Sequence, residues 1–203
     1  MFKLYSQLTK FGIVIFVLLA GIAGYATGFF IESTFSVKHF GYFLLGLYFL
    51  SSGSLALNQV QEYKLDQKMP RTQNRPIASG KIKPLAGLIF SLSMLLVGIN
   101  ILFEMSVTAG WVAVTSVVLY NGLYTMLWKP KWVFAAVPGA IPGALPVTIG
   151  YAINNPDIFN SESVYLFMIM FLWQMSHFFF ISLEFIEDYR KRRFPTFPVT
   201  VFF

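Results

Sequence analysis

Three oxygen-bearing side chains recur at four-residue intervals in the most polar stretch of an otherwise apolar chain. Asn58, Glu62 and Asp66 follow a run of apolar and small residues. On a continuing helix, positions i, i+4 and i+8 fan over an arc of about 80°, so these side chains point the same way. Mg²⁺ prefers such oxygen ligands and is usually held by a few carboxylates together with substrate phosphates. The spacing therefore predicts a magnesium site at a helix end.

A second acidic cluster near the C-terminus repeats this spacing. Glu184 and Asp188 are also four residues apart, and His177 lies within about 40° of the same helix face. A single pair of acids at a helix end is more often a solvated terminus than a metal site, and this alternative stays open for each cluster taken alone. Two such clusters in one chain favour a common function for both of them, such as metal binding.

Arginines stand directly after the first cluster. Arg71 and Arg75 belong to the segment Arg-Thr-Gln-Asn-Arg-Pro, residues 71–76. A guanidinium fork can hold a phosphate group at two points. Acids for a metal and bases for a diphosphate, placed at the mouth of apolar helices, fit a substrate with a charged head and a long apolar tail. An isoprenyl diphosphate has this shape.

The composition places these residues in a membrane protein. Apolar residues make up 56% of the 203 positions and charged residues 12%, against about a quarter charged in soluble domains. Cysteine is absent, which excludes disulfides and thiolate metal sites. A lipid-exposed backbone must satisfy its own hydrogen bonds, so the apolar runs predict transmembrane helices. The six predicted spans are residues 11–31, 40–57, 85–103, 107–128, 132–153 and 163–184.

The basic residues predict an orientation for these spans. With a cytoplasmic N-terminus, fourteen of the fifteen Lys and Arg residues fall on the cytoplasmic side, and only Lys38 lies outside. This distribution follows the positive-inside rule and places both acidic clusters on the cytoplasmic side. Topology and contact with anionic lipid account for the net charge of +6, so nucleic acid is not an expected partner.

An ordered set of motifs runs from about residue 50 to the end of the chain. They are Asn58-Gln59, Glu62, Leu65-Asp66, Met69, Arg71-Thr72, Asn74-Arg75-Pro76, Ser79-Gly80, Leu123-Tyr124-Thr125, VPGAIPGALPVTIGY from Val137 to Tyr151, WQMSHFF from Trp173 to Phe179, Glu187-Asp188-Tyr189, Pro195 and Pro198-Val199. Together they resemble the UbiA-type intramembrane prenyltransferase family, and within it the members that prenylate haem.

The resemblance implies an all-α transmembrane bundle of roughly nine helices around a central cavity. Six of these spans would lie in this chain, so residues 1–203 would form a single transmembrane prenyltransferase domain without the C-terminal third. The implied reaction is Mg²⁺-dependent transfer of a farnesyl-like group from an isoprenyl diphosphate to haem b, giving haem O. It would take place in a bacterial inner membrane, with the active-site loops in the cytoplasm.

The resemblance also assigns roles to individual residues. The catalytic residues would be Asn58, Glu62, Asp66 and Asp188. The metal ligands would be Asn58, Glu62 and Asp66 in the first site and Glu184 and Asp188 in the second. Arg71, Arg75 and Lys81 would bind the diphosphate. Tyr124 and His177 are further candidate substrate-binding residues, chosen from their own positions in the predicted spans and not from the resemblance.

Some positions depart from the haem-prenylating pattern. Lys64 stands where an acid is usual, and it would either contact the diphosphate or repel a second metal ion. Phe185 and Ile186 replace basic residues before Glu187, and Glu184 is an added acid. These changes favour an aromatic quinone precursor as the alternative acceptor. A non-catalytic shortened paralogue or a permease-like bundle is the alternative outside the enzyme class.

Smaller signals have two interpretations each. Pro138, Pro142 and Pro146 alternate with Gly139 and Gly143, a pattern that indicates either close helix packing or the wall of a cavity.

Three polar side chains within the spans are equally open. His177 would either contact a substrate, such as a haem propionate or the iron, or pack through a hydrogen bond. For Asn121 and Tyr124 the sequence favours hydrogen bonds between helices over contact with a substrate.

Overall fold

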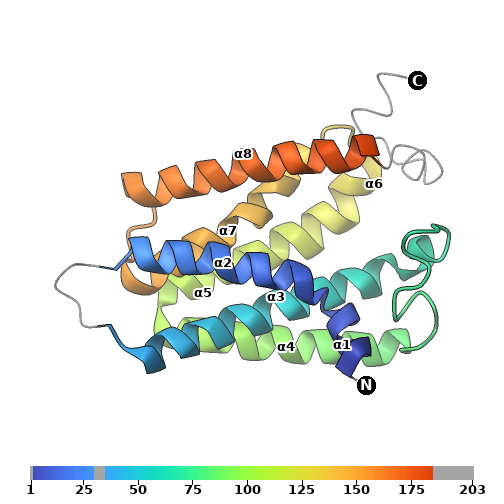
Figure 1. Ribbon diagram of the computed structural model, residues 1–203, viewed down its shortest axis with the longest axis horizontal. Coiled ribbons are helices and arrows are strands. Elements are labelled where there is room, and N and C mark those ends of the chain that lie inside the picture. The colour runs from blue at the N-terminus through green and yellow to red at the C-terminus, as the bar shows by residue number, and fades with distance from the viewer. Residues whose placement is uncertain (1, 30–34, 185–203) are drawn as a thin grey trace.

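The computed structural model describes residues 2–29 and 35–184, and this part of the chain is helical without strands. The helices form a bundle in which most run along one long axis (Figure 1). Their bounds are α1 Phe2–Leu8, α2 Phe11–Thr27, α3 Val37–Asp66, α4 Pro84–Met105, α5 Val107–Val117, the π-helix η1 Val118–Trp128, α6 Lys129–Lys131, α7 Ala136–Asn154 and α8 Ser161–Glu184.

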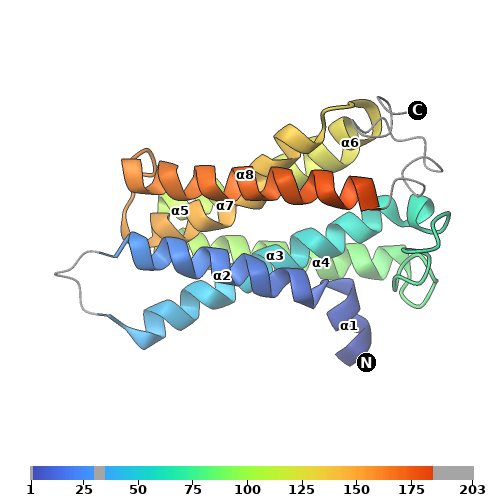
Figure 2. The ribbon, with the colours of Figure 1, turned by 45° about the horizontal axis from the view of Figure 1, so that its top comes forward.

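The predicted spans correspond to these helices, with shifted ends. Five are long and apolar enough to cross a membrane, the third of them running continuously from Val107 to Lys131, and α2 is a shorter apolar helix. The second span was predicted to end at residue 57, but α3 continues to Asp66. The protein is therefore an all-α, multi-pass integral membrane protein. Sequence periodicity did not predict the short helix α1, which is set at an angle to α2 (Figure 2).

Local sequence explains where several helices begin. The Ser36 hydroxyl accepts a hydrogen bond from the His39 N–H at 3.3 Å, which caps α3. Ser106 caps α5 in the same way through the Ala109 N–H, also at 3.3 Å. Pro84 occupies the first turn of α4, where its missing N–H is not needed.

Helix α7 lies at the centre of the bundle and packs against α2, α5 and α8. Glycines permit its close contact with α2. A Cβ added to Gly24 would overlap the carbonyl of Val147, and one added to Gly150 would overlap the carbonyl of Gly21. Small residues let helix backbones approach in this way inside membranes. Of the side chains around this seam, Tyr25 and Ile149 belong to the main buried core.

The basic residues gather at one end of the bundle. The C-terminal end of α3, the segment 67–83, α1 and α6 all lie at the right-hand end of Figure 1, whereas Lys38 stands at the opposite end, where α3 begins. Among the described residues, Lys38 is the only Lys or Arg at that opposite end. The polar end of the bundle is therefore the place where the predicted site residues can meet.

Candidate functional site

The extension of α3 to Asp66 carries the first acidic cluster. Asn58, Glu62 and Asp66 are 3%, 4% and 1% exposed, so all three polar side chains are buried on one face of a single helix. Buried carboxylates need charged or hydrogen-bonding partners. The surrounding elements supply them.

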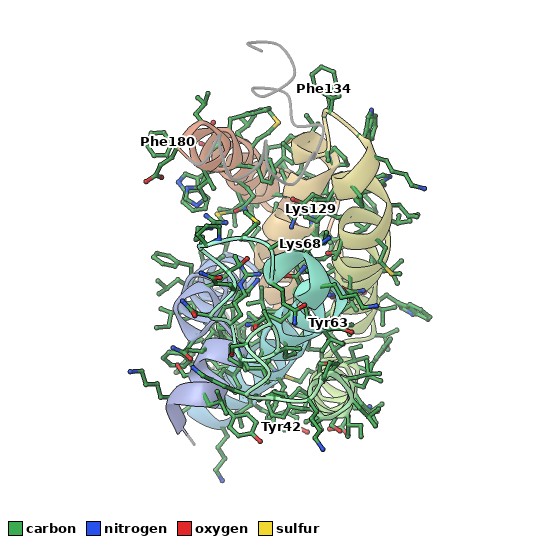
Figure 3. The ribbon with its side chains drawn as sticks, turned by 90° about the vertical axis from the view of Figure 1, so that its right-hand side faces the viewer. Tyr42, Tyr63, Lys68, Lys129, Phe134 and Phe180 are labelled. Carbon is green, nitrogen blue, oxygen red and sulfur yellow. The ribbon has the colours of Figure 1, made fainter. Side chains whose placement is uncertain are left out.

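Two basic side chains pair with the two carboxylates. Arg75, from the segment after α3, places Nη1 2.8 Å from Asp66 Oδ2. Lys129, the first residue of α6 directly after η1, places Nζ 2.5 Å from Glu62 Oε1. Figure 3 looks onto this end of the bundle, with Lys129 labelled. The sequence had assigned Lys129 to topology alone, so its place beside Glu62 is a finding of the structure.

A third cation reaches the cluster from the N-terminus. Lys10 Nζ donates a hydrogen bond to Asn58 Oδ1 at 3.0 Å. Lys10 has a φ of 51°, a left-handed conformation that is uncommon for a residue other than glycine, and it forms the corner between α1 and α2. This corner directs the side chain toward α3. Lys10 was also missed by the sequence, because no local pattern predicts the corner.

Gln59 secures that corner. Its Nε2 donates to the carbonyls of Gln7 at 2.8 Å and Leu8 at 2.9 Å. Carbonyls at the end of a helix have no partner within the helix, so this amide caps α1. The adjacent residues Asn58 and Gln59 thus both fix the position of Lys10. Asn58 binds its side chain, and Gln59 binds the backbone that precedes it.

Burial, together with the nearby positive charge of Arg75, lowers the pKa of Lys10 from 10.5 to about 7. Between about pH 7 and pH 10.5 the unfolded chain therefore binds one more proton than the folded chain, so this residue makes stability rise with pH. We expect the melting temperature of the substrate-free protein in detergent to rise across this range more steeply than that of Lys10→Met. Equal pH dependence in the two proteins would contradict the lowered pKa.

Polar pairs join α3 to η1 and to the first residue of α6 at a constant spacing. In each pair the two residues are 67 positions apart, so the two helices run in the same direction and in register. The pairs are Ser54 with Asn121, Asn58 with Thr125, and Glu62 with Lys129. We call these three pairs the polar ladder. It ties the face that carries the acidic cluster to the π-helix.

Asn121 makes the first rung of the ladder. Its Nδ2 donates to the Ser54 carbonyl at 3.0 Å and to Gln61 Oε1 at 3.2 Å, and its Oδ1 accepts from the Ser54 hydroxyl at 2.6 Å. Gln61 Nε2 donates back to the Asn121 carbonyl at 2.9 Å. The favoured interpretation of Asn121, hydrogen bonding between helices, is confirmed.

Tyr124 belongs to an aromatic wall beside the ladder. Its buried ring stacks on Tyr120 with centroids 6.0 Å apart and meets the edge of Phe178 at 6.5 Å. A Cβ added to Gly139 would lie 2.5 Å from Tyr124 Cε2. Gly139 thus permits close helix packing, which was one of the two interpretations of the proline and glycine pattern. The Tyr124 ring extends from η1 and contacts both α7 and α8.

Three other basic residues discussed in the sequence analysis are exposed. Arg71 and Lys81 are exposed in the segment after α3. Lys64 is exposed on the opposite side of α3 from Glu62 and Asp66, with Nζ 5.9 Å from the centroid of the Tyr63 ring. Neither interpretation of Lys64 matches this position, because its side chain points away from the acidic face.

The second acidic cluster is described only in part. Glu184 is exposed at the end of α8, and Asp188 lies outside the described residues. His177 is exposed and its ring stacks on Trp173 with centroids 5.2 Å apart. Within residues 2–29 and 35–184, no group of three or more His, Cys, Asp or Glu side chains could hold a metal ion. The first cluster offers two carboxylates and one amide.

Comparison with known proteins decides the family. The family model described as "UbiA prenyltransferase family" matches residues 13–201. The chain belongs to the UbiA prenyltransferase family. It is 65% identical to a protoheme IX farnesyltransferase of Bdellovibrio bacteriovorus, over 99% of this chain and 69% of that protein. It is 32% identical to a protoheme IX farnesyltransferase of Baumannia cicadellinicola, over 98% of this chain and 68% of that protein.

Solved structures show the same fold at low sequence identity. A digeranylgeranylglyceryl phosphate synthase superposes with a TM-score of 0.79 at 19% identity, over 99% of this chain and 69% of that one. A UbiA homologue from Archaeoglobus fulgidus bound to GPP and Mg²⁺ superposes with a TM-score of 0.75 at 15% identity, over 97% and 68%. The chain spans a little over two thirds of these family members.

Proposed function

We propose that this family member transfers a farnesyl-like group from an isoprenyl diphosphate to haem b, giving haem O. The 65% identity with a protoheme IX farnesyltransferase supports this reaction. The observation that carries the proposal is the buried cluster at the end of α3, where two carboxylates and an amide each face a basic side chain. Such a set of opposite charges suits a metal–diphosphate headgroup better than a neutral ligand.

The basic side chains would bind the diphosphate. Lys10, Arg75 and Lys129 come from three separate segments. A phosphate oxygen would compete with their present partners for each of these three basic groups. Arg75 can grip phosphate at two points, whereas the lysines act as point charges. Arg71 and Lys81 remain proposed contacts at the exposed edge of this group, and His177 remains a proposed substrate contact.

The oxygen-bearing side chains fit a magnesium ion. Asn58, Glu62 and Asp66 would hold it, because Mg²⁺ is usually bound through one or two carboxylates and the phosphates of its substrate. Bound there, the ion would neutralise charge on the departing diphosphate. The UbiA homologue from A. fulgidus bound to GPP and Mg²⁺ supports this choice of metal. Glu184 and Asp188 remain proposed ligands of a second ion.

The reaction would begin when the bond between the allylic carbon and the diphosphate oxygen breaks. The electron pair leaves with the diphosphate, and Lys10, Arg75 and Lys129 stabilise its growing charge, which is where catalysis of an ionisation must act. The aromatic wall of Tyr120 and Tyr124 would shield the allylic cation from water and stabilise it through its ring faces.

The acceptor would then attack the allylic cation. In haem b a vinyl group forms the new carbon–carbon bond, and later addition of water, with loss of a proton, completes the hydroxylated product. An aromatic quinone precursor is the second candidate, and the replacement of basic residues by Phe185 and Ile186 favours it. Both acceptors supply an electron pair to the same cation.

Product analysis tests the acceptor. Protein expressed from its full reading frame and placed in lipid nanodiscs would receive farnesyl diphosphate, Mg²⁺ and either haem b or 4-hydroxybenzoate. We expect mass spectrometry to detect haem O and no prenylated benzoate. A prenylated benzoate without haem O would select the alternative acceptor. The absence of a prenylated product with either acceptor would contradict the proposed reaction. Shorter and longer diphosphates in the same assay would define the prenyl length.

Gly139→Ala tests the aromatic wall. The added methyl group would displace the Tyr124 ring, and overpacking of this kind costs about 1–3 kcal/mol of stability. We expect turnover to fall because the ring leaves its place beside the allylic cation. Gly122→Ala is the matched control, since a Cβ there meets nothing within 4 Å. Unchanged turnover in Gly139→Ala would remove Tyr124 from the proposed site.

We also propose a cytoplasmic position for the site, in a bacterial inner membrane. The gathering of basic residues at the end of α3 supports this orientation through the positive-inside rule. The chain has no cysteine, so single introduced cysteines report accessibility without background. We expect an impermeant maleimide to label Lys38→Cys in spheroplasts and Lys68→Cys only after lysis. The reverse pattern would invert the topology.

A further inference from the structure

We propose that Thr125 is a positioning residue that fixes the amide of Asn58 with its oxygen directed toward the site. Thr125 forms the middle rung of the polar ladder and is 6% exposed. The inference rests on the proposed function, because it concerns which atom Asn58 offers to the metal–diphosphate group.

The hydrogen bonds of Thr125 have a defined direction. Its Oγ1 lies 2.7 Å from the carbonyl oxygen of Tyr120 and 3.4 Å from Asn58 Nδ2. A hydroxyl has one hydrogen to donate, and a carbonyl can only accept. The hydrogen therefore goes to Tyr120, and the lone pairs of Thr125 are left to accept from the NH₂ group of Asn58.

In its protonated form, Lys10 requires the same orientation from the other side of the amide. An ammonium has donors and no acceptor, and Lys10 Nζ lies 3.0 Å from Asn58 Oδ1. A reversed amide would place its NH₂ group against the ammonium and its oxygen against the lone pairs of Thr125. Asn58 is 3% exposed, so little water is available to compensate for two such contacts.

Substrate binding would affect the two partners of Asn58, Lys10 and Thr125, in different ways. Lys10 is a proposed diphosphate ligand, so a phosphate oxygen would compete with Asn58 for its ammonium. Thr125 belongs to η1, and its hydroxyl keeps its bond to the Tyr120 carbonyl within the same helix. The hydroxyl of Thr125 would therefore continue to hold the NH₂ group of Asn58 and leave Oδ1 free to act as a hard ligand.

Binding of inorganic pyrophosphate tests this role without turnover. Calorimetry of the full-length protein in nanodiscs would compare wild type, Thr125→Val and Thr125→Ser, each with pyrophosphate and Mg²⁺. Valine keeps the shape but removes the hydroxyl, so we expect about tenfold weaker binding. Serine keeps the hydroxyl and should bind within about twofold of wild type. Wild-type affinity in Thr125→Val would overturn the inference. Thr125→Ala removes the same hydroxyl and replaces Thr125→Val if that variant does not fold.

A second background separates orientation from packing. In Asn58→Asp the two carboxylate oxygens are equivalent, so there is no orientation left to select. Thr125→Val should then weaken pyrophosphate binding much less than it does beside Asn58. An equal loss in both backgrounds would overturn the positioning role and assign the effect to packing. Thr115→Val, which removes an exposed hydroxyl from α5, should bind as wild type does.

The same measurements distinguish the two proposals. Wild-type protein that binds no pyrophosphate with Mg²⁺ would overturn the proposed function and this inference with it. Wild-type binding that Thr125→Val leaves unchanged would overturn only the role of Thr125.

Discussion

Asp66→Asn should reduce prenyl transfer by at least about 10³-fold while the protein stays folded in the membrane. Asparagine keeps the volume of the side chain but removes the charge that pairs with Arg75 at 2.8 Å and that a magnesium ion would need. A bound metal contributes several kcal/mol to transition-state stabilisation, and about 1.4 kcal/mol corresponds to a factor of ten in rate. The expected loss follows from these two quantities.

The measurement is prenyl transfer over a range of Mg²⁺ concentrations, with helix content followed by circular dichroism. Asp157→Asn is the matched control, because Asp157 is an exposed aspartate between α7 and α8, at the opposite end of the bundle. It should retain wild-type activity. Wild-type turnover by Asp66→Asn at every Mg²⁺ concentration would exclude a role for Asp66 in metal binding.

Variants of the Glu62–Lys129 pair should differ in stability while all of them lose catalysis. The two side chains are 6% and 17% exposed, so removing one of them leaves a largely buried charge without this partner. Such a loss costs about 3–5 kcal/mol when a buried pair is broken, whereas removing both charges costs much less. We expect Glu62→Gln and Lys129→Met to be destabilised singly and the double variant to recover part of that stability. Prenyl transfer should stay lost in all three.

A double-mutant cycle measures this, with melting temperature and turnover recorded for each protein. Tyr42→Phe provides a control for the loss of an exposed contact, since the Tyr42 hydroxyl donates to Glu104 at 2.6 Å on the surface between α3 and α4. We expect it to change the melting temperature little and turnover not at all. Recovery of transfer together with stability in the double variant would show that the pair is structural only.

The helices could be predicted from the sequence because apolar runs of about 20 residues report directly on the membrane. The shared face of Asn58, Glu62 and Asp66 followed from their spacing, because α3 remains a regular α-helix to Asp66. The π-helix could not be predicted in this way. Its residues 118–128 are as apolar as those of an α-helix, and the amino-acid composition does not distinguish the hydrogen bonding of a π-helix from that of an α-helix.

The partners of the cluster depend on tertiary structure. Lys10 and Lys129 were counted among the residues that set topology, since nothing nearby in sequence distinguishes them from other cytoplasmic lysines. Lys10 reaches Asn58 only through a left-handed corner, and Lys129 reaches Glu62 only because α3 and η1 run parallel in register. Asp188 was predicted from the sequence and lies outside the described residues, so its role stays a prediction.

The seam between α2 and α7 has a consequence for the synthesis of the protein. Asn154 Nδ2 donates to the Tyr25 carbonyl, 129 positions earlier in the chain. At about 5–20 residues per second, α7 leaves the ribosome about 6–26 s after α2. During that interval the glycine face of α2, including Gly24, borders lipid or the insertion machinery instead of the backbone of α7. Helices α2 and α7 therefore join late in biogenesis, and a bulky residue at Gly24 would block that late step after the helices between them had already entered the membrane.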